Sequence, residues 1–89
     1  MPNLTLEIIN VKGLHARASA KLVEVVEAHD GRAMISKDGL EVSGDSIMGL
    51  LMLAASKGTF IDVETSGAAA DELAEALKTL VADKFGEEN

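Results

Sequence analysis

The chain lacks several residue types altogether. It contains no cysteine, no tryptophan and no tyrosine, and only two phenylalanines. Without cysteine the protein can form no disulfide, no thiolate zinc site and no thiol nucleophile. The shortage of aromatic rings leaves little to stack on nucleic-acid bases, and a formal net charge of −7 has the wrong sign for binding a phosphate backbone. We therefore expect no nucleic-acid partner, no metal and no other cofactor.

Long hydrophobic runs are also missing. The longest apolar stretch, residues 47–55, is far too short to span a bilayer. Residues 1–5 have neither the basic region nor the apolar core of a signal peptide. We expect a single domain over residues 1–89 that is cytoplasmic and does not insert into a membrane.

The hydrophobic pattern changes period several times along the chain, which predicts alternating strands and helices. The predicted elements are a strand at 4–8, a helix at about 16–29, strands at 32–37 and 40–43 joined by an Asp38-Gly39 hairpin turn, a short helix at about 46–57 closed by Gly58, a strand at 59–65, a helix at about 68–85 and a frayed acidic tail, 86–89. This βαββαβα order predicts an α+β open-faced sandwich, in which a four-stranded antiparallel sheet carries three helices on one face.

The most informative segment is Gly13-Leu14-His15-Ala16-Arg17-Ala18-Ser19, where one histidine precedes a predicted helix. A helix start offers free backbone N–H groups and the positive end of the helix dipole, so it is a seat for a phosphate. Gly13 allows a tight turn and Leu14 can anchor the loop in the core. The amides of Ala16 and Arg17 can then receive phosphate oxygens, and the Arg17 guanidinium can add charge-assisted bonds.

Two interpretations of His15 remain open from the residues alone. The ring is either a phosphoryl-accepting nucleophile, flanked by the positive charges of Lys12 and Arg17, or a surface histidine that caps the helix. A shared metal site is excluded because His29, the only other histidine, lies at the far end of the same predicted helix. No serine is identifiably activated, so a Ser–His–acid triad is unsupported.

A second candidate region begins at Ser46, which precedes the short helix. Ser46 is either a plain N-cap or a phosphorylation site, and both roles are compatible at a helix start. The short helix is apolar nearly all round. Leu50, Leu53 and Ala54 are expected in the core, whereas an exposed docking patch is expected to comprise Ile47, Met48 and Leu51, completed by Ala16 and Ala20.

Residues 13–19 resemble the active-site signature of the histidine-containing phosphocarrier (HPr) family, and Ser46 to Leu53 resembles the serine-phosphorylation segment of that family. The resemblance implies a monomeric carrier rather than a stand-alone enzyme. Such a carrier takes a phosphoryl group from phosphorylated Enzyme I and passes it to an EIIA-type protein. It further implies that His15 is phosphorylated through Nδ1, that Arg17 is its charge partner, and that Ser46 is the regulatory site of an HPr kinase/phosphorylase.

The chain departs from the usual family pattern at a few positions. Ala18 stands where most members have proline, and Lys12 where many sugar-system members have a small polar residue. Glu24, Glu27 and Asp45 are acidic where those members are often basic. This acidic rim favours the nitrogen-related branch of the phosphotransferase system, or a non-catalytic regulatory module that acts through Ile47 and Met48 and the state of Ser46.

Overall fold

The computed structural model describes residues 3–89, so Met1 and Pro2 of the expected pre-strand segment lie outside the described residues. The sheet is four-stranded and antiparallel, with the spatial order β1-β4-β2-β3. The bounds are β1 (Asn3–Glu7), α1 (Ala16–Glu27), β2 (Arg32–Lys37), β3 (Leu40–Ser43), α2 (Ile47–Met52), β4 (Phe60–Ser66), α3 (Ala70–Ala82) and a 3₁₀ turn, η1 (Lys84–Gly86). The predicted fold class and element order are confirmed.

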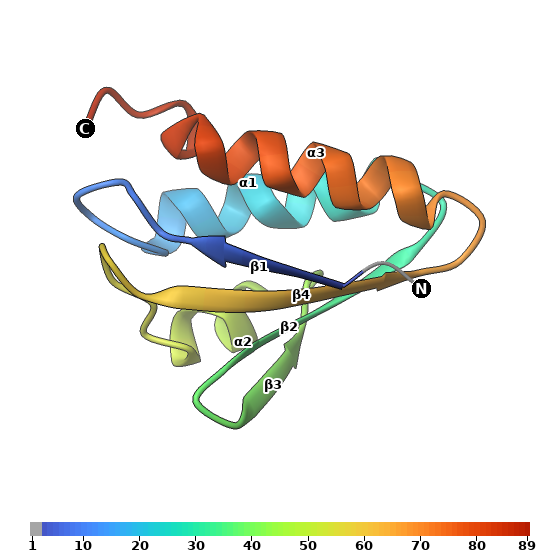
Figure 1. Ribbon diagram of the computed structural model, residues 1–89, viewed down its shortest axis with the longest axis horizontal. Coiled ribbons are helices and arrows are strands. Elements are labelled where there is room, and N and C mark those ends of the chain that lie inside the picture. The colour runs from blue at the N-terminus through green and yellow to red at the C-terminus, as the bar shows by residue number, and fades with distance from the viewer. Residues whose placement is uncertain (1–2) are drawn as a thin grey trace.

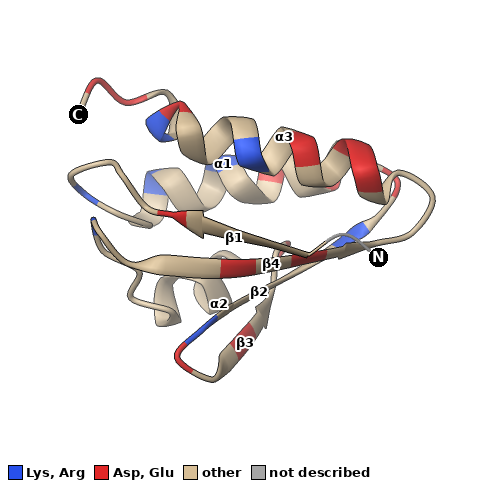
Figure 2. Ribbon diagram, in the orientation of Figure 1, with Lys and Arg blue, Asp and Glu red and all other residues tan. Residues whose placement is uncertain are grey.

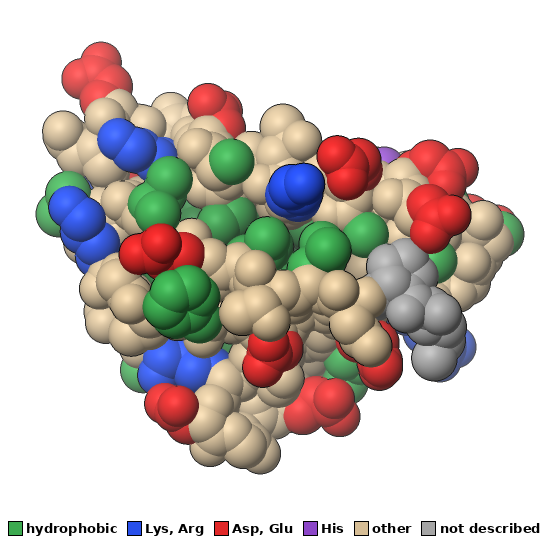
Figure 3. Space-filling model, in the orientation of Figure 1, with side chains coloured by type: hydrophobic (Ala, Val, Ile, Leu, Met, Phe, Trp, Pro, Cys, Tyr) green, Lys and Arg blue, Asp and Glu red, His purple; other side chains and the backbone are tan. Residues whose placement is uncertain are grey.

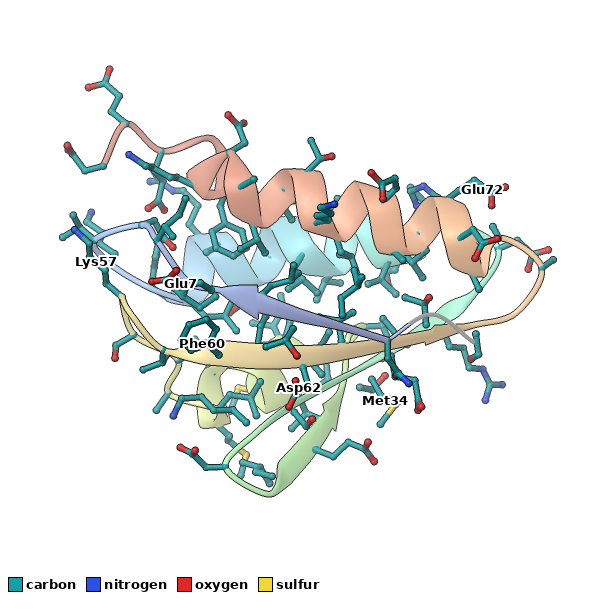
Figure 4. The ribbon with its side chains drawn as sticks, viewed as in Figure 1. Glu7, Met34, Lys57, Phe60, Asp62 and Glu72 are labelled. Atoms are coloured by element: carbon teal, nitrogen blue, oxygen red, sulfur yellow. The ribbon has the colours of Figure 1, made fainter. Side chains whose placement is uncertain are left out.

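One face of the sheet supports the helices, and the other is open. In Figure 1, α1 and α3 lie side by side above the strands and α2 is partly hidden behind β4. The alternation of β4 buries Ile61, Val63 and Thr65 towards the helices. Asp62 points to the open face, where it accepts a hydrogen bond from Thr5 Oγ1 at 2.7 Å, and Met34 lies on the same face (Figure 4).

The long helices bury one stripe each, as helical spacing requires. In α1 the stripe contains Ala18, Leu22 and Val26, and in α3 it contains Leu73, Leu77 and Val81. The two-residue turn between β2 and β3 has positive φ at both Asp38 (51°) and Gly39 (85°), which is the geometry that joins twisted antiparallel strands most readily. The hairpin predicted at these residues is confirmed.

The helix ends differ from the prediction, and long-range contacts accompany the turns that follow α2 and α3. The first helix ends at Glu27 instead of His29, with Ala28 as its C-cap. The second ends at Met52 instead of continuing to Lys57, because the chain turns at Ala54 (φ 50°) so that the Ala55 carbonyl accepts from Leu14 N–H. Ala54 is therefore exposed, contrary to expectation, and Ala55 is buried in its place.

The last helix begins at Ala70, after the positive-φ turn at Gly67, and ends at Ala82 instead of Phe85. Lys84 and Phe85 both adopt φ 56°, which breaks the helix and turns the Phe85 side chain into the core, where it is fully buried. The segment that follows, 86–89, is not frayed as predicted. It folds back over the loop that precedes α1, where Val11 N–H donates to the Asn89 carbonyl at 2.8 Å.

Candidate functional site

His15 is the N-cap residue of α1. Its backbone is extended, with φ −76° and ψ −177°, and its carbonyl accepts the first bond of the helix from Ser19 N–H at 2.8 Å. The ring makes no capping hydrogen bond. His15 therefore occupies the predicted cap position, but its side chain does not cap the helix.

The loop before His15 is held in place by hydrogen bonds and by one buried side chain. Gly13 has φ +64°, and a Cβ there would lie 2.4 Å from the Ala55 carbonyl oxygen, so the position requires glycine. Leu14 is buried as predicted, its N–H donates to Ala55 O at 2.8 Å, and its carbonyl accepts from the buried Ser19 hydroxyl. These contacts fix the direction in which the chain enters α1.

The amides of Ala16 and Arg17 belong to the first turn of α1, where no carbonyl within the helix can reach them. Within residues 3–89 neither amide donates to a backbone carbonyl outside the helix, and the cap side chain does not reach them. Both residues are exposed. The structure thus leaves donors open at the positive end of α1, next to the ring.

A surface hollow of about 300 Å³ adjoins the ring, lined by Val11, Lys12, His15, Arg17 and residues 87–89. Figure 2 shows several of the blue, positively charged segments at the end of the molecule where α1 begins, and Figure 3 shows blue side chains along the same end. Neither Arg17 nor Lys12 forms an ion pair with any described residue. Two unpaired cations therefore face a hollow beside the ring.

A carboxylate at this site was not predicted. Glu87 Oε2 lies against His15 Nε2, and Glu87 Oε1 accepts from Asn10 Nδ2 at 3.0 Å. The hydrogen bond from His15 lowers the pKa of the Glu87 carboxyl below its ordinary value, helped by Asn10 and by the charges of His15 and Lys12, against the opposing effect of partial burial. The field around His15 is therefore not purely basic, and Figure 2 shows the red tail over the same end.

Asn10 and Glu87 are the residues that sequence reasoning missed. Asn10 is fully buried, and its side-chain amide also donates to the Gly13 carbonyl at 2.8 Å, closing the turn that precedes the histidine. An asparagine three residues before a glycine is a usable turn signal. Glu87 has no such signal, since 72 positions separate it from His15 in the chain.

Ser46 is the N-cap of α2, and its hydroxyl accepts from Gly49 N–H at 3.0 Å. The capping role predicted for it is confirmed. The neighbouring Asp45 is exposed and accepts from Ser43 Oγ at 2.6 Å. The Ser46 side chain is half-buried, and its oxygen is already engaged at a helix start.

The apolar residues of α2 divide between core and surface as expected. Leu50 is fully buried, and the exposed residues are Ile47 (41%), Met48 (71%) and Leu51 (37%). Met52, at 66% exposure, extends this group and was not predicted. We refer to residues 47, 48, 51 and 52 as the apolar patch. Helix α2 packs on α1, on which Ala16 is exposed and Ala20 half-buried.

The second histidine is far from this chemistry along α1. His29 lies just beyond the end of the helix, and its Nδ1 bonds the Val25 carbonyl at 2.7 Å, which suits a residue at the negative end of the dipole. Residues 3–89 contain no cluster of three or more His, Asp or Glu side chains placed to hold a metal ion. Over the same residues, no helix is both long and apolar enough to cross a membrane.

Comparison with known proteins identifies the family. The family model described as "PTS HPr component phosphorylation site" matches residues 3–83. The chain is 47% identical to phosphocarrier protein HPr of Neisseria meningitidis over 83 residues, 93% of each chain, and 36% identical to phosphocarrier protein NPr of Escherichia coli over 85 residues, 94% of each chain.

Its fold is similar to the crystal structure of HPr from Thermoanaerobacter tengcongensis, with a TM-score of 0.95, 36% identity and full coverage of both chains. The match of sequence and fold extends over the loop, the first turn of α1 and the Ser46 segment alike. The chain therefore belongs to the HPr family of phosphocarrier proteins, which serve phosphoryl transfer in the bacterial phosphotransferase system.

Proposed function

We propose that His15 is the phosphoryl acceptor of this carrier, that phosphorylated Enzyme I is its donor, and that an EIIA-type protein is the acceptor that follows. The observation that carries the proposal is the placement of the ring at the N-cap of α1, making no capping bond and bordering a hollow that Lys12 and Arg17 also line. Backbone donors and cations stand beside one nucleophile, which is the arrangement that phosphoryl transfer needs.

The transfer itself requires little covalent chemistry from the protein. An imidazole nitrogen with a free lone pair attacks the phosphorus, and the bond between phosphorus and the donor breaks. The amides of Ala16 and Arg17 receive phosphoryl oxygens, and the Arg17 guanidinium neutralises part of their charge. Because the ring loses its phosphoryl group by the same path, the site serves acceptance and donation equally well.

The test uses the two histidines as a matched pair. The protein is incubated with Enzyme I and phosphoenolpyruvate, and acid-labile phosphate is measured on wild type, His15→Ala and His29→Ala. We expect wild type and His29→Ala to be labelled equally and His15→Ala to accept nothing while remaining folded. Undiminished label on His15→Ala would remove His15 from the mechanism.

A second candidate function is regulatory docking through the apolar patch, governed by Ser46. Four large apolar side chains lie exposed on one short helix, with Met48 exposed by 71%, and flexible methionines suit such a surface. A phosphate on Ser46 would add a charge of about −1.5 to −2 next to Asp45 and change docking more than folding.

Capture of the EIIA-type partner by variants of this protein distinguishes the two functions. In the regulatory scheme Ser46→Asp weakens binding of the EIIA-type partner while His15→Ala does not. Loss of capture in His15→Ala alone would count against regulation through Ser46.

The exposed acidic residues Glu24, Glu27 and Asp45 are the basis for the prediction of the nitrogen-related branch. We propose that the cognate EIIA-type partner presents a docking face with matching basic residues, since electrostatic complementarity chiefly sets the association rate. We further propose that the carrier acts as a monomer, which sedimentation of the unphosphorylated and phosphorylated protein would test.

A further inference from the structure

The contact between Glu87 and His15 has no role in the scheme above. It joins the last described segment to the first turn of α1, and Figure 1 shows this segment lying beside the loop between β1 and α1. The Glu87 side chain is 17% exposed and the His15 side chain 27% exposed, so both groups are partly withdrawn from water. A carboxylate in this position influences any chemistry of the ring.

Glu87 is placed by anchors on both sides of it. On one side Phe85 is fully buried, and its carbonyl accepts from Lys21 Nζ at 2.7 Å. On the other side the Asn89 carbonyl accepts from Val11 N–H at 2.8 Å. The carboxylate between these anchors is therefore held over the ring by the fold and not by its own contact alone.

Asn10 connects the carboxylate to the loop. Its Nδ2 group donates to Glu87 Oε1 at 3.0 Å and to the Gly13 carbonyl at 2.8 Å. The same buried amide thus holds the turn before His15 and one oxygen of the carboxylate beside it. The second oxygen is left to face the imidazole.

The chemistry of the two partners determines where the proton lies. An ionised carboxylate only accepts hydrogen bonds, and a neutral imidazole carries one N–H. In the neutral ring, the form that acts as a nucleophile, the contact at Nε2 requires the proton on Nε2, which leaves the lone pair on Nδ1. Partners of this kind fix the tautomer and orientation of ligating histidines in other proteins.

We propose that Glu87 is a positioning residue for phosphoryl transfer: it holds the His15 ring with Nε2 protonated, so that Nδ1 faces the incoming phosphorus. The inference rests on the proposed function of His15 and adds a residue to that site. Of the two acidic side chains that line the hollow, Glu88 is exposed and only Glu87 forms a hydrogen bond or ion pair with His15 among the described residues, so we assign the role to Glu87.

The transfer step balances with this proton in place. The Nδ1 lone pair forms the new N–P bond while the bond between phosphorus and the donor group of phosphorylated Enzyme I breaks, and that electron pair returns to the donor atom. The proton stays on Nε2 throughout. The phosphorylated ring then carries a positive charge, which lies directly against the Glu87 carboxylate and is stabilised by it.

The experiment compares wild type, Glu87→Gln and the control Glu88→Gln, which removes the same charge one residue away. Glutamine matches glutamate in size but is neutral and can also donate, so it no longer enforces one tautomer. We expect a slowly exchanging, downfield Nε2–H proton of His15 in the NMR spectra of wild type and Glu88→Gln, and its loss in Glu87→Gln. We expect acceptance from phosphorylated Enzyme I to slow about tenfold in Glu87→Gln only, the lower end of the effect when a histidine loses its orienting partner.

Three outcomes decide the matter. An unchanged Nε2–H signal in Glu87→Gln overturns the proposal, whatever the kinetics. Acceptance that is equally fast or faster in Glu87→Gln also overturns it, because the carboxylate would then be idle or a shield. If wild type and Glu88→Gln accept no phosphoryl group at all, the proposed function has failed first, and this result differs from a wild type that reacts alongside an unaffected Glu87→Gln.

Discussion

At the scale of the single residue, His15 takes its environment from distant parts of the chain. Gly13 and Asn10 shape the loop before it, the Ala55 carbonyl holds Leu14, and Glu87 lies against its ring. The glycine, the leucine and the histidine could be assigned from the sequence because their roles depend on neighbours a few residues away. The carboxylate could not, since only the folded chain brings it to the ring.

Replacing Gly13 tests the loop directly. Gly13→Ala places a Cβ 2.4 Å from Ala55 O and 2.9 Å from Ser56 Cα at φ +64°, so both strain and collision oppose it. We expect the free energy of unfolding to fall by about 1–3 kcal/mol, measured by urea denaturation. The control is Gly39→Ala, where φ is +85° but no atom lies within 4 Å of the added Cβ. If both variants lose the same free energy of unfolding, the collision with Ala55 and Ser56 does not contribute.

The lowered pKa of Glu87 predicts a pH dependence of stability. A carboxyl whose pKa is lower in the folded state stabilises that state fully above its unfolded pKa, here 4.5, and loses this contribution as the pH falls through the folded value. The difference in free energy of unfolding between wild type and Glu87→Gln is therefore expected to shrink as the pH drops below that range. If this difference grows as the pH falls, the pKa of Glu87 is not lowered in the folded protein.

At the scale of the element, periodicity predicted the type and order of the α-helices and strands, but it predicted neither the 3₁₀ turn η1 nor where the helices stop. The turns that follow α2 and α3 contain non-glycine residues with positive φ, Ala54 after α2 and Lys84 and Phe85 after α3, a conformation that local propensity disfavours. Each is compensated by a long-range interaction, the bond between Leu14 and Ala55 in one case and the burial of Phe85 in the other. Tertiary contacts, which a single sequence does not display, determine these ends.

Helix α2 depends on its cap. Ser46→Ala removes the acceptor of the Gly49 N–H bond and is expected to lower the free energy of unfolding by about 1 kcal/mol. Ser46→Asp retains a capping oxygen and is expected to stay close to wild type. Urea denaturation measures the free energy of unfolding of these variants. The control is Ser43→Ala, which changes an exposed serine that donates to Asp45. If Ser46→Ala is as stable as wild type, the cap does not stabilise α2.

At the scale of the whole molecule, the fold brings the C-terminal segment back to the loop between β1 and α1 (Figure 1). The loop after β1, the first turn of α1 and residues 87–89 meet around one hollow. The site is therefore a product of the closed domain and not of a local motif. Anything that loosens the last segment is expected to alter the chemistry of His15.

The two phenylalanines provide the test. Phe85→Ala empties a fully buried position and is expected to cost about 3–5 kcal/mol of the free energy of unfolding, and to release Glu87 from the ring. Phe60→Ala, at a site 56% exposed on β4, is expected to cost less than about 1 kcal/mol. Urea denaturation measures the loss of stability, and the Nε2–H signal of His15 reports the contact with Glu87. If the signal survives in folded Phe85→Ala, burial of Phe85 is not needed to hold Glu87 against the ring.

The most direct test of the central claim is an NMR experiment on the phosphorylated carrier that detects coupling between phosphorus and the ring nitrogens. After incubation of ¹⁵N-labelled protein with Enzyme I and phosphoenolpyruvate, we expect coupling to Nδ1 of His15, with the proton retained on Nε2. Coupling to Nε2, phosphorus on His29, or no phosphohistidine at all would contradict the assignment of His15 as the carrier.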